Sequence, residues 1–289
     1  MIAEKDFAGR QACGSREYQE DAYAFSDILG EGNQVEGLLV VLADGMGGHT
    51  SGDQASKLAL ESFVSAFHAA GGTLSERLRH SVIEANSAIA RKSRKSPELE
   101  GMGTTLLAAG MTQEGVEWIS VGDSPLYLWR DGALNRLNAD HSFRPMLRNM
   151  METGELTPAD VAKHPFRNLL RAALNGEEIE LIDQPGEPVA LRDGDLIIAA
   201  SDGVQTLNDE DIAVALANPA SPDAAALASG LLQAVLDAKH PKQDNITIAI
   251  IRAGSGGFVA REAAPVSKGD THAMTIFMNP MKRNEPCGN

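Results

Sequence analysis

The stretch Leu38-Leu-Val-Val-Leu-Ala-Asp-Gly-Met-Gly-Gly48 decides the fold of this chain. Its apolar part, 38–43, predicts a buried strand that breaks abruptly into Asp44 and a group of glycines. Such a strand would hold one carboxylate at its end with little freedom to move, and glycines let backbone approach closely. Carboxylate and carbonyl oxygens are the ligands that Mg²⁺ and Mn²⁺ prefer. The stretch therefore indicates a cation site, with a plain type I′ or II′ turn as the alternative.

Composition narrows the class of protein. The 289 residues could form one large domain or two small ones, and the net charge of −15 argues against binding to nucleic acid. With only 4% aromatic residues, the core must be built from Leu, Ile, Val, Ala and Met. The first residues do not resemble a signal peptide, and no apolar run approaches the roughly 18 residues of a membrane span. We expect a soluble, cytoplasmic protein with no nucleic-acid or membrane partner.

The two cysteines, Cys13 and Cys287, stand at opposite ends of the sequence. Their spacing suggests neither a disulfide pair nor a zinc site. A reducing compartment is therefore expected.

Helices are expected in pairs between groups of strands. The pattern predicts strands at 7–13, 22–25, 38–43, 104–111, 116–121, 125–129, 133–137, 178–183, 196–201 and 246–251. It predicts helices at about 51–70 and 75–94, a helical segment within 140–176 that starts at Thr157-Pro158, and two helices after Asn208 and Ser221. This order favours an α+β protein with antiparallel sheets and outer helices over a parallel doubly wound sheet.

One catalytic-type domain is expected over residues 1–253. Residues 254–289 have low periodicity and several prolines, and we expect them to form a poorly ordered tail.

Acidic residues stand at the ends of several predicted strands. Asp44 and Asp202 each follow an apolar run and precede glycine, Asp244 precedes the run 246–251, and Asp123 lies between two strands. A single Asp-Gly pair is usually a turn, but separate strand ends can converge, so the four together predict a shared metal site.

The charge of such a site suits an anionic substrate. Three carboxylates around two divalent ions leave about +1 of net charge. Two ions roughly 3.5–4 Å apart can activate a bridging water and clamp an in-line displacement. Arg16 adds a planar fork that suits phosphate oxygens, the alternative being a surface ion pair with Glu17 or Glu20.

A set of short motifs resembles the metal-dependent protein phosphatases, the type 2C family. The motifs occur in the family's order and cover roughly residues 7 to 252: Arg16-Glu-Tyr-Gln-Glu20-Asp21, Ala43-Asp-Gly-Met-Gly-Gly-His49, Gly103-Thr-Thr105, Val121-Gly-Asp-Ser124, Asp140-His-Ser142, His164-Pro-Phe-Arg-Asn168, Ala200-Ser-Asp-Gly203 and Gln243-Asp-Asn-Ile-Thr247. Each motif is weak alone, and the set is specific.

The resemblance implies a fold and a reaction. The fold is a four-layer α-β-β-α sandwich with two central antiparallel sheets flanked by pairs of helices. The reaction is hydrolysis of phosphoserine and phosphothreonine in proteins by water or hydroxide that bridges two Mn²⁺ or Mg²⁺ ions. A flap over about 141–183 should lie beside the active site.

The resemblance also assigns roles by position. Asp44 should bridge the two metals, the carbonyl of Gly45 should bind one of them, and Asp202 and Asp244 should complete the pair. Asp123 should join Asp202 at a third metal position. The remaining roles are outer-sphere metal contacts for Glu20 and Asp21, and substrate phosphate binding for Arg16.

The sequence departs from the family pattern at two places. Met46 stands where eukaryotic members have a histidine proposed as the general acid, so the proton donor is open between His49, His141 and a water in the site. Pro125 stands where many bacterial members have arginine after Gly-Asp-Ser, so we expect different local contacts there.

Partners follow from the resemblance. We expect a monomer that acts on phosphoprotein substrates and opposes a bacterial Ser/Thr kinase and its targets. One alternative is a partner-switching regulator with a single dedicated phosphoprotein substrate. The other is a non-catalytic relative that binds phosphoproteins, against which the three carboxylates Asp44, Asp202 and Asp244 speak.

Overall fold

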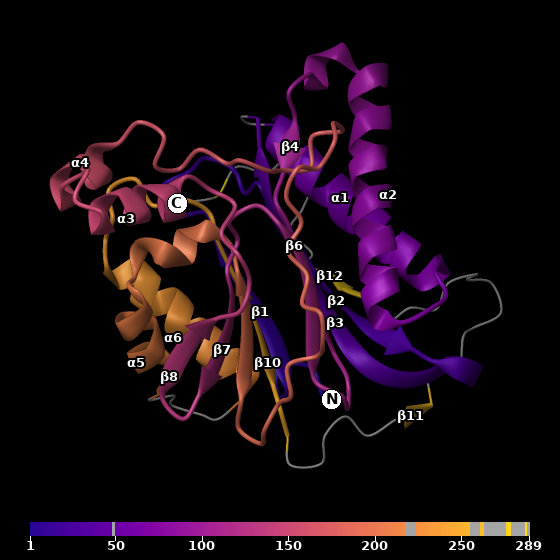
Figure 1. Cartoon of the computed structure of the whole chain (residues 1–289). Coiled ribbons are helices and arrows are strands. Elements are labelled where there is room, and N and C mark those ends of the chain that lie inside the picture. The colour runs from indigo at the N-terminus through magenta and orange to yellow at the C-terminus, as the bar shows by residue number, and fades with distance from the viewer. Residues whose placement is uncertain (48–49, 218–222, 255–260, 263–275, 279–286, 288–289) are drawn as a thin grey trace.

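Two antiparallel β-sheets packed face to face form the centre of the molecule (Figure 1). The computed structural model describes residues 1–47, 50–217, 223–254, 261–262, 276–278 and 287. The first sheet has the order β1 (Phe7–Ala12), β10 (Ile246–Arg252), β9 (Leu196–Ala200), β7 (Leu126–Arg130), β8 (Ala133–Arg136). The second has the order β12 (Ile276–Met278), β2 (Asp21–Leu29), β3 (Gln34–Met46), β5 (Leu106–Met111), β6 (Val116–Val121), with β4 (Gly103–Thr104) and β11 (Arg261–Glu262) also paired to β3.

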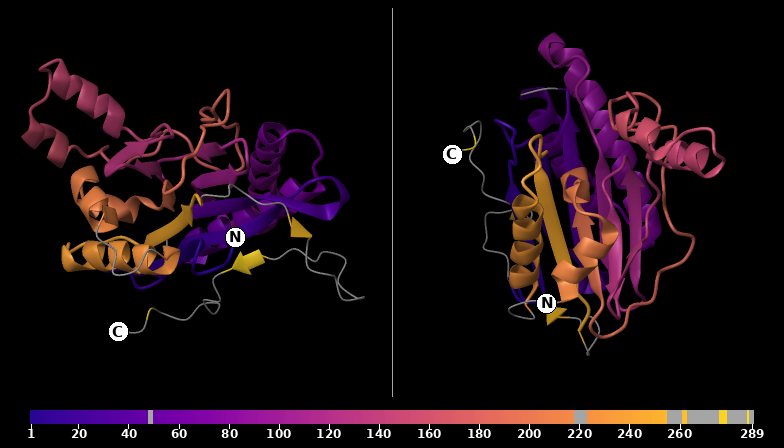
Figure 2. Two further views of the ribbon diagram at one scale, coloured as in Figure 1. Left: turned by 90° about the horizontal axis from the view of Figure 1, so that it is seen from below. Right: turned by 90° about the vertical axis from the view of Figure 1, so that its left-hand side faces the viewer.

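Helices cover both outer faces of this pair of sheets (Figure 2). Helices α1 (Thr50–Ala69) and α2 (Leu74–Lys95) pack on the second sheet, and α5 (Asp209–Ala217) and α6 (Ala224–Asp237) pack on the first. The short helices α3 (Arg144–Glu152) and α4 (Pro158–Lys163) project at one end of the sandwich (Figure 1). Three 3₁₀ turns, Glu31–Asn33, Pro97–Leu99 and Asp202–Thr206, complete the helical segments. The expected α-β-β-α sandwich is confirmed.

The apolar run in β3 has a direct structural cause. Leu38 and Val40 belong to the core between the two sheets, whereas Leu39 and Val41 belong to the core under α1 and α2. Because successive side chains of a strand point to opposite faces, a strand with a layer on each side must be apolar at every position. The same rule explains the run in β9, where Ile197 faces the other sheet.

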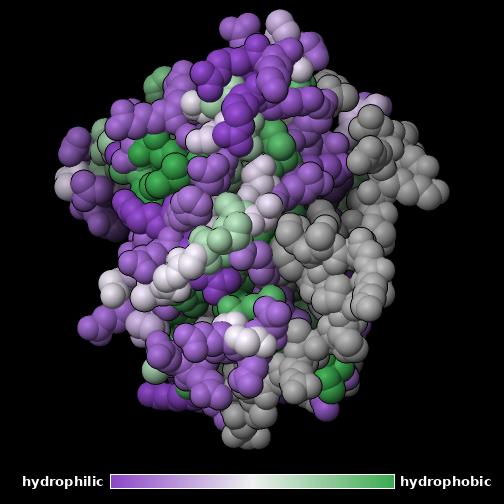
Figure 3. Space-filling model, turned by 90° about the vertical axis from the view of Figure 1, so that its right-hand side faces the viewer, coloured by the Kyte–Doolittle hydropathy of each residue, from purple (hydrophilic) through white to green (hydrophobic). Residues whose placement is uncertain are grey.

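Two helix starts follow their local sequence signals. Thr157 caps α4, its Oγ1 accepting from the N–H of Asp160 at 3.2 Å, with Pro158 in the first turn, as expected. Thr73 and Glu76 form the same reciprocal box at the start of α2. Seen from the right-hand side of Figure 1, the surface of the described residues is mostly hydrophilic, with hydrophobic side chains in separate patches (Figure 3). In the described residues, no helix has the length and apolar character needed to cross a bilayer.

The predicted strand at 178–183 is wrong. The segment touches the second sheet through a single bridge between Asp183 and Ser120 in β6, and Val189 makes another with Val116. It runs along the edge of β6 as irregular chain, with Asp183 accepting a hydrogen bond from the indole N–H of Trp118 at 2.7 Å. Its β-forming residues serve to cover an edge and do not extend the ladder.

The expectation that the cysteines are unpaired is also wrong. Cys13 and Cys287 form a disulfide with a Cα–Cα distance of 6.3 Å. Strand β12 runs antiparallel to β2, with Ile276 opposite Ser26 and Met278 opposite Ala24, so the chain heads back toward the start of β2. Most of the expected tail, 254–289, lies outside the described residues, and its order stays a prediction.

Candidate metal centre

Asp21 and Asp44 lie opposite each other at one end of the second sheet. They are register partners in the β2–β3 ladder. Asp44 is on the same face of β3 as Leu38 and Val40. Asp21 is two residues from Tyr23, so it also lies on the face of its strand that meets the other sheet. Both carboxylates therefore point into the open end of the space between the sheets.

The first sheet brings two further acids to the same end. Asp202 follows β9 with only Ser201 between them, and Asp244 precedes β10 with only Asn245 between them. These strands are antiparallel neighbours, so the end of one lies beside the start of the other. The approach is close: a Cβ on Gly203 would lie 2.0 Å from the carbonyl oxygen of Asn245. Only glycine fits there, which explains the Asp-Gly pair at this strand end.

Gly45 is required for a similar reason. A Cβ at this position would lie 2.2 Å from the carbonyl oxygen of Gly52 in the first turn of α1 and 2.6 Å from that of Glu20. Its N–H donates to the Glu20 carbonyl at 3.2 Å. The Glu20 side chain lies against α1, because Oε1 would be 2.6 Å from a Cβ on Gly52. Gly45 near the end of β3 and Gly52 in α1 thus let α1 pack closely against the acid-bearing strand ends.

Hydrogen bonds join Asp21 of the second sheet to the first sheet. The hydroxyl of Thr247 in β10 donates to Asp21 Oδ2 at 2.7 Å, and Gln11 Nε2 donates to the same hydroxyl at 2.8 Å. On the second sheet, the carbonyl of Asp44 accepts from the hydroxyl of Thr104 at 2.8 Å and from the N–H of Thr105 at 2.9 Å. The backbone that carries the acids is therefore fixed on both sides.

The acids raise one another's pKa. Burial, and then the charges of Asp202 and Asp244, raise the pKa of Asp21 to about 7, against hydrogen bonds from Thr247 and Ser201 that lower it. Burial raises the pKa of Asp44 well above its usual range, and further increases come from the charges of Asp21, Asp202, Asp123 and Asp244. Burial and the charge of Asp202 raise the pKa of Asp123 to about 7. Mutual repulsion on this scale means that the four predicted acids and Asp21 lie within electrostatic reach of one another.

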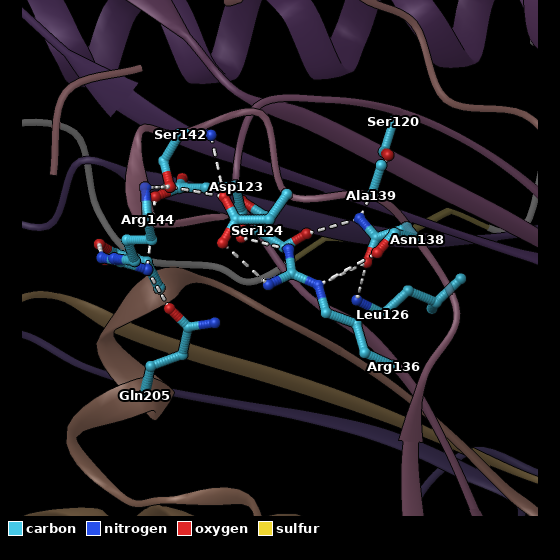
Figure 4. Close-up of polar contacts among 12 residues, drawn as sticks. Ser120, Asp123, Ser124, Leu126, Arg136, Asn138, Ala139, Ser142, Arg144 and Gln205 are labelled. Atoms are coloured by element: carbon cyan, nitrogen blue, oxygen red, sulfur yellow. Dashed lines mark hydrogen bonds and ion pairs between the residues drawn. The ribbon is translucent and has the colours of Figure 1, made fainter. Parts of the chain in front are cut away.

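Two arginines supply positive charge at the rim. Arg16 Nη2 lies 2.7 Å from Asp244 Oδ2, and this hydrogen bond raises the pKa of Arg16. Arg144, in the first turn of α3, lies 3.1 Å from Asp202, measured from Nη2 to Oδ2, and 3.6 Å from Asp123, measured from Nη1 to Oδ2. Figure 4 shows Arg144 beside Asp123. Arg16 is half exposed, at 53% of its side chain, so it can turn toward a ligand, whereas Arg144 is largely covered.

The loop that carries Asp123 is held by Arg136 and His141. Arg136 Nη2 donates to the Asp123 carbonyl at 2.9 Å (Figure 4), and Nδ1 of His141 accepts from the N–H of Gly122 at 3.3 Å. His141 is buried, which lowers its pKa. An imidazole that accepts at Nδ1 carries its proton on Nε2, so His141 is a neutral support for this loop. The other histidine candidate, His49, lies outside the described residues.

These acids fit divalent cations by their chemistry. They are hard oxygen donors, gathered with more negative charge than Arg16 and Arg144 neutralise. In the ranges described, no three acidic, histidine or cysteine side chains already adopt the spacing of a closed metal site. Asp202 is turned toward Arg144 and Asp244 toward Arg16, which accounts for the separation of the acidic side chains.

Arg144 and Thr247 contact the acids of the site, and sequence reasoning missed both of them. Thr247 stands in the quoted motif 243–247, and the alternation of β10 would have placed it on the same face as Ala249, toward the other sheet. Arg144 follows the motif 140–142, but no local signal says that α3 folds back over the strand ends.

Comparisons with known proteins agree with the motifs. Residues 8–238 match the family described as protein phosphatase 2C. The serine/threonine protein phosphatase PstP of Mycobacterium tuberculosis is 36% identical over 214 residues, which cover 73% of this chain and 40% of that protein. This chain therefore spans about two fifths of that relative's length. The serine/threonine phosphatase stp of Listeria monocytogenes is 34% identical over 177 residues, covering 60% of this chain and 68% of the relative.

A solved structure shares the fold. The crystal structure of the catalytic domain of PstP, in complex with two manganese ions, has a TM-score of 0.65 and 32% identity. The match covers 85% of this chain and 96% of that one.

Proposed function

This chain belongs to the protein phosphatase 2C family, and on that premise we propose that it is a metal-dependent phosphatase that hydrolyses phosphoserine and phosphothreonine in proteins. One observation carries the proposal: acids from both sheets converge at one end of the sandwich, and their burial and repulsion call for cations. Arg16 stands at the rim of the same cluster. The site is thus arranged to attract an anion to a cation centre.

We propose that two Mn²⁺ or Mg²⁺ ions bind at Asp44, the carbonyl of Gly45, Asp202 and Asp244. The PstP catalytic domain with two manganese ions supports this number. When bound, such a pair supplies a nucleophile by lowering the pKa of water and neutralises charge on the phosphoryl group. Asp21 and Glu20 lie behind this set and would orient water around it.

The residues of the chain would divide the remaining work. The strand ends hold the carboxylates rigidly, because the glycine contacts and the Thr247 bond to Asp21 fix both sheets. Arg16 would release Asp244 and bind the substrate phosphate instead. Its planar guanidinium has a geometry suited to two phosphate oxygens. His141 would hold the Asp123 loop, which leaves His49 or a water in the site to protonate the leaving oxygen.

Hydrolysis of p-nitrophenyl phosphate and of a phosphothreonine peptide tests the reaction. We expect turnover with Mn²⁺ and loss of turnover with EDTA, restored by excess Mn²⁺. Absence of metal-dependent turnover on either compound would refute the enzyme and favour the phosphoprotein-binding alternative.

The substrate class is proposed as phosphoproteins, including a Ser/Thr kinase and its targets in the cytoplasm, with the phosphatase acting as a monomer. A panel of phosphoproteins separates this from the partner-switching alternative. Comparable kcat/KM values over several phosphoproteins would support the broad role. Activity on p-nitrophenyl phosphate together with only one phosphoprotein would support the dedicated role.

A further inference from the structure

Arg144 occupies the space between two of the acids. Its guanidinium contacts Asp202 at 3.1 Å and Asp123 at 3.6 Å, and it also bonds to the side-chain oxygen of Gln205 (Figure 4). Asn168 Oδ1 accepts from Nη2 at 3.3 Å. Oxygen atoms from four residues on three segments, with Asp202 and Gln205 in one 3₁₀ turn, therefore surround one side chain, as they would surround an ion.

Arg144 is also held from behind. The backbone N–H of Arg144 donates to Ser142 Oγ at 3.2 Å, and that hydroxyl donates to Asp140 Oδ1 at 2.6 Å. Asp140 in turn pairs with Arg136 at 3.4 Å. With 18% of its side chain exposed, Arg144 is far more confined than an ordinary surface ion-pair partner.

We propose that Arg144 is a built-in cation that takes the place of a divalent ion between Asp123 and Asp202. The inference rests on the function proposed above. Mg²⁺ would need carboxylate oxygens at about 2.0–2.1 Å, and the guanidinium nitrogens fill the space in which such an ion would sit. Both cations neutralise the same two carboxylates, so they compete. The protein therefore binds two divalent ions, and the third position expected from the resemblance is closed by the chain itself.

This arrangement makes Arg144 a positioning residue. It links α3, and with it the segment 141–183, to the carboxylates of the metal centre through side chains alone. An ion in that place would leave α3 without this tie.

The number of bound ions tests the proposal directly. Equilibrium dialysis against Mn²⁺ from micromolar to millimolar concentrations, with the metal counted by mass spectrometry, gives the stoichiometry of the full chain. We expect two ions for the unaltered protein and three for R144A. The exposed Arg148, one turn further along α3, provides the matched control R148A, which should bind two. R144A combined with Asp123→Asn should return to two.

Two further variants protect the test against misfolding. R144Q removes the charge but keeps a hydrogen-bonding group for Gln205, and it should bind three ions; R144K keeps the charge and should bind two. Three ions in the unaltered protein, or two in both R144A and R144Q, would overturn the proposal while leaving the phosphatase function standing. No Mn²⁺ bound by any of the proteins would refute the proposed function, and this inference with it.

Discussion

Asp21 and Asp44 are direct partners across the β2–β3 ladder, and both point into the space between the sheets. Like charges placed opposite each other destabilise a ladder unless a counter-charge lies between them. Among the described residues, the Asp21 carboxylate accepts hydrogen bonds from two hydroxyls, those of Thr247 and Ser201, and not from a cation. The pair therefore costs the metal-free protein stability that a bound cation would restore.

Replacing Asp44 by asparagine should abolish turnover and leave the fold intact. Loss of one charge from the cation centre should lower kcat by on the order of 100-fold or more. In EDTA at pH 8 the variant should melt at a higher temperature than the unaltered protein, because a buried, repelled carboxylate has been removed. Asp131→Asn is the matched control, since Asp131 is 86% exposed in the turn after β7. Near-normal turnover in the Asp44 variant would refute its role.

Metal-free stability should fall as the pH rises. The pKa values of Asp21 and Asp123 are raised to about 7 in the folded chain, above those of an unfolded aspartate. Between about pH 4 and pH 7 the folded state therefore binds more protons than the unfolded state, so stability decreases through this window. Melting temperatures in EDTA from pH 5 to pH 8 should decline, and Mn²⁺ should remove most of the decline. Asp21→Asn should flatten the EDTA curve; an unchanged slope would contradict the burial of this charge.

Replacing Arg16 by alanine should mainly raise KM. A charge-assisted hydrogen bond to phosphate would be lost, which corresponds to about a tenfold rise or more. The KM of Arg16→Lys should lie between those of the unaltered protein and of Arg16→Ala, because lysine keeps the charge but not the planar fork. Arg192→Ala, at a side chain 70% exposed, serves as control. If KM for a phosphopeptide is unchanged in Arg16→Ala, then Arg16 is only the surface partner of Asp244.

Gly203→Ala should separate the ends of β9 and β10. The new Cβ would meet the carbonyl oxygen of Asn245 at 2.0 Å, and that oxygen belongs to backbone that cannot turn aside. We expect a loss of roughly 1–3 kcal/mol in the free energy of unfolding and weaker Mn²⁺ binding. Gly230→Ala, in open space within α6, should instead stabilise by about 0.5–1 kcal/mol. Equal stability of both variants in urea would contradict the close approach.

Breaking the bond between Cys13 and Cys287 should destabilise the oxidised protein. The bridge spans 274 residues of sequence and constrains the unfolded chain, so Cys287→Ser should cost roughly 2–5 kcal/mol without reductant. With reductant the two proteins should unfold alike. Peptide mapping without reductant should find the two cysteines linked; two free thiols in the oxidised protein would rule the bridge out.

The sequence located the strand ends well because their signals are local. An apolar run followed by Asp-Gly marks both Asp44 and Asp202, and the antiparallel order of strands implies that they converge. The contacts that complete the site are not local. Arg144 reaches Asp202 across 58 residues, and Thr247 reaches Asp21 across 226, so neither contact leaves a pattern in its own segment.

The two wrong expectations have the same physical origin. Residues 178–183 have strand-like composition, but they pair with the edge strand β6 through an isolated bridge and not through a continuous ladder. Cysteines far apart in sequence say nothing about pairing until the direction of β12 is known. In both cases the tertiary arrangement overrode what composition favoured.

The pairing of β12 with β2 also bears on how copies of this chain behave toward one another. A strand at the margin of a sheet presents unpaired N–H and C=O groups on which a foreign strand can assemble. Here β12, the last strand among the described residues, takes that position beside the nine-residue β2. A shortened form ending before residue 261 would leave the edge of β2 unpaired. We expect such a form to self-associate along that edge rather than to lose catalytic activity.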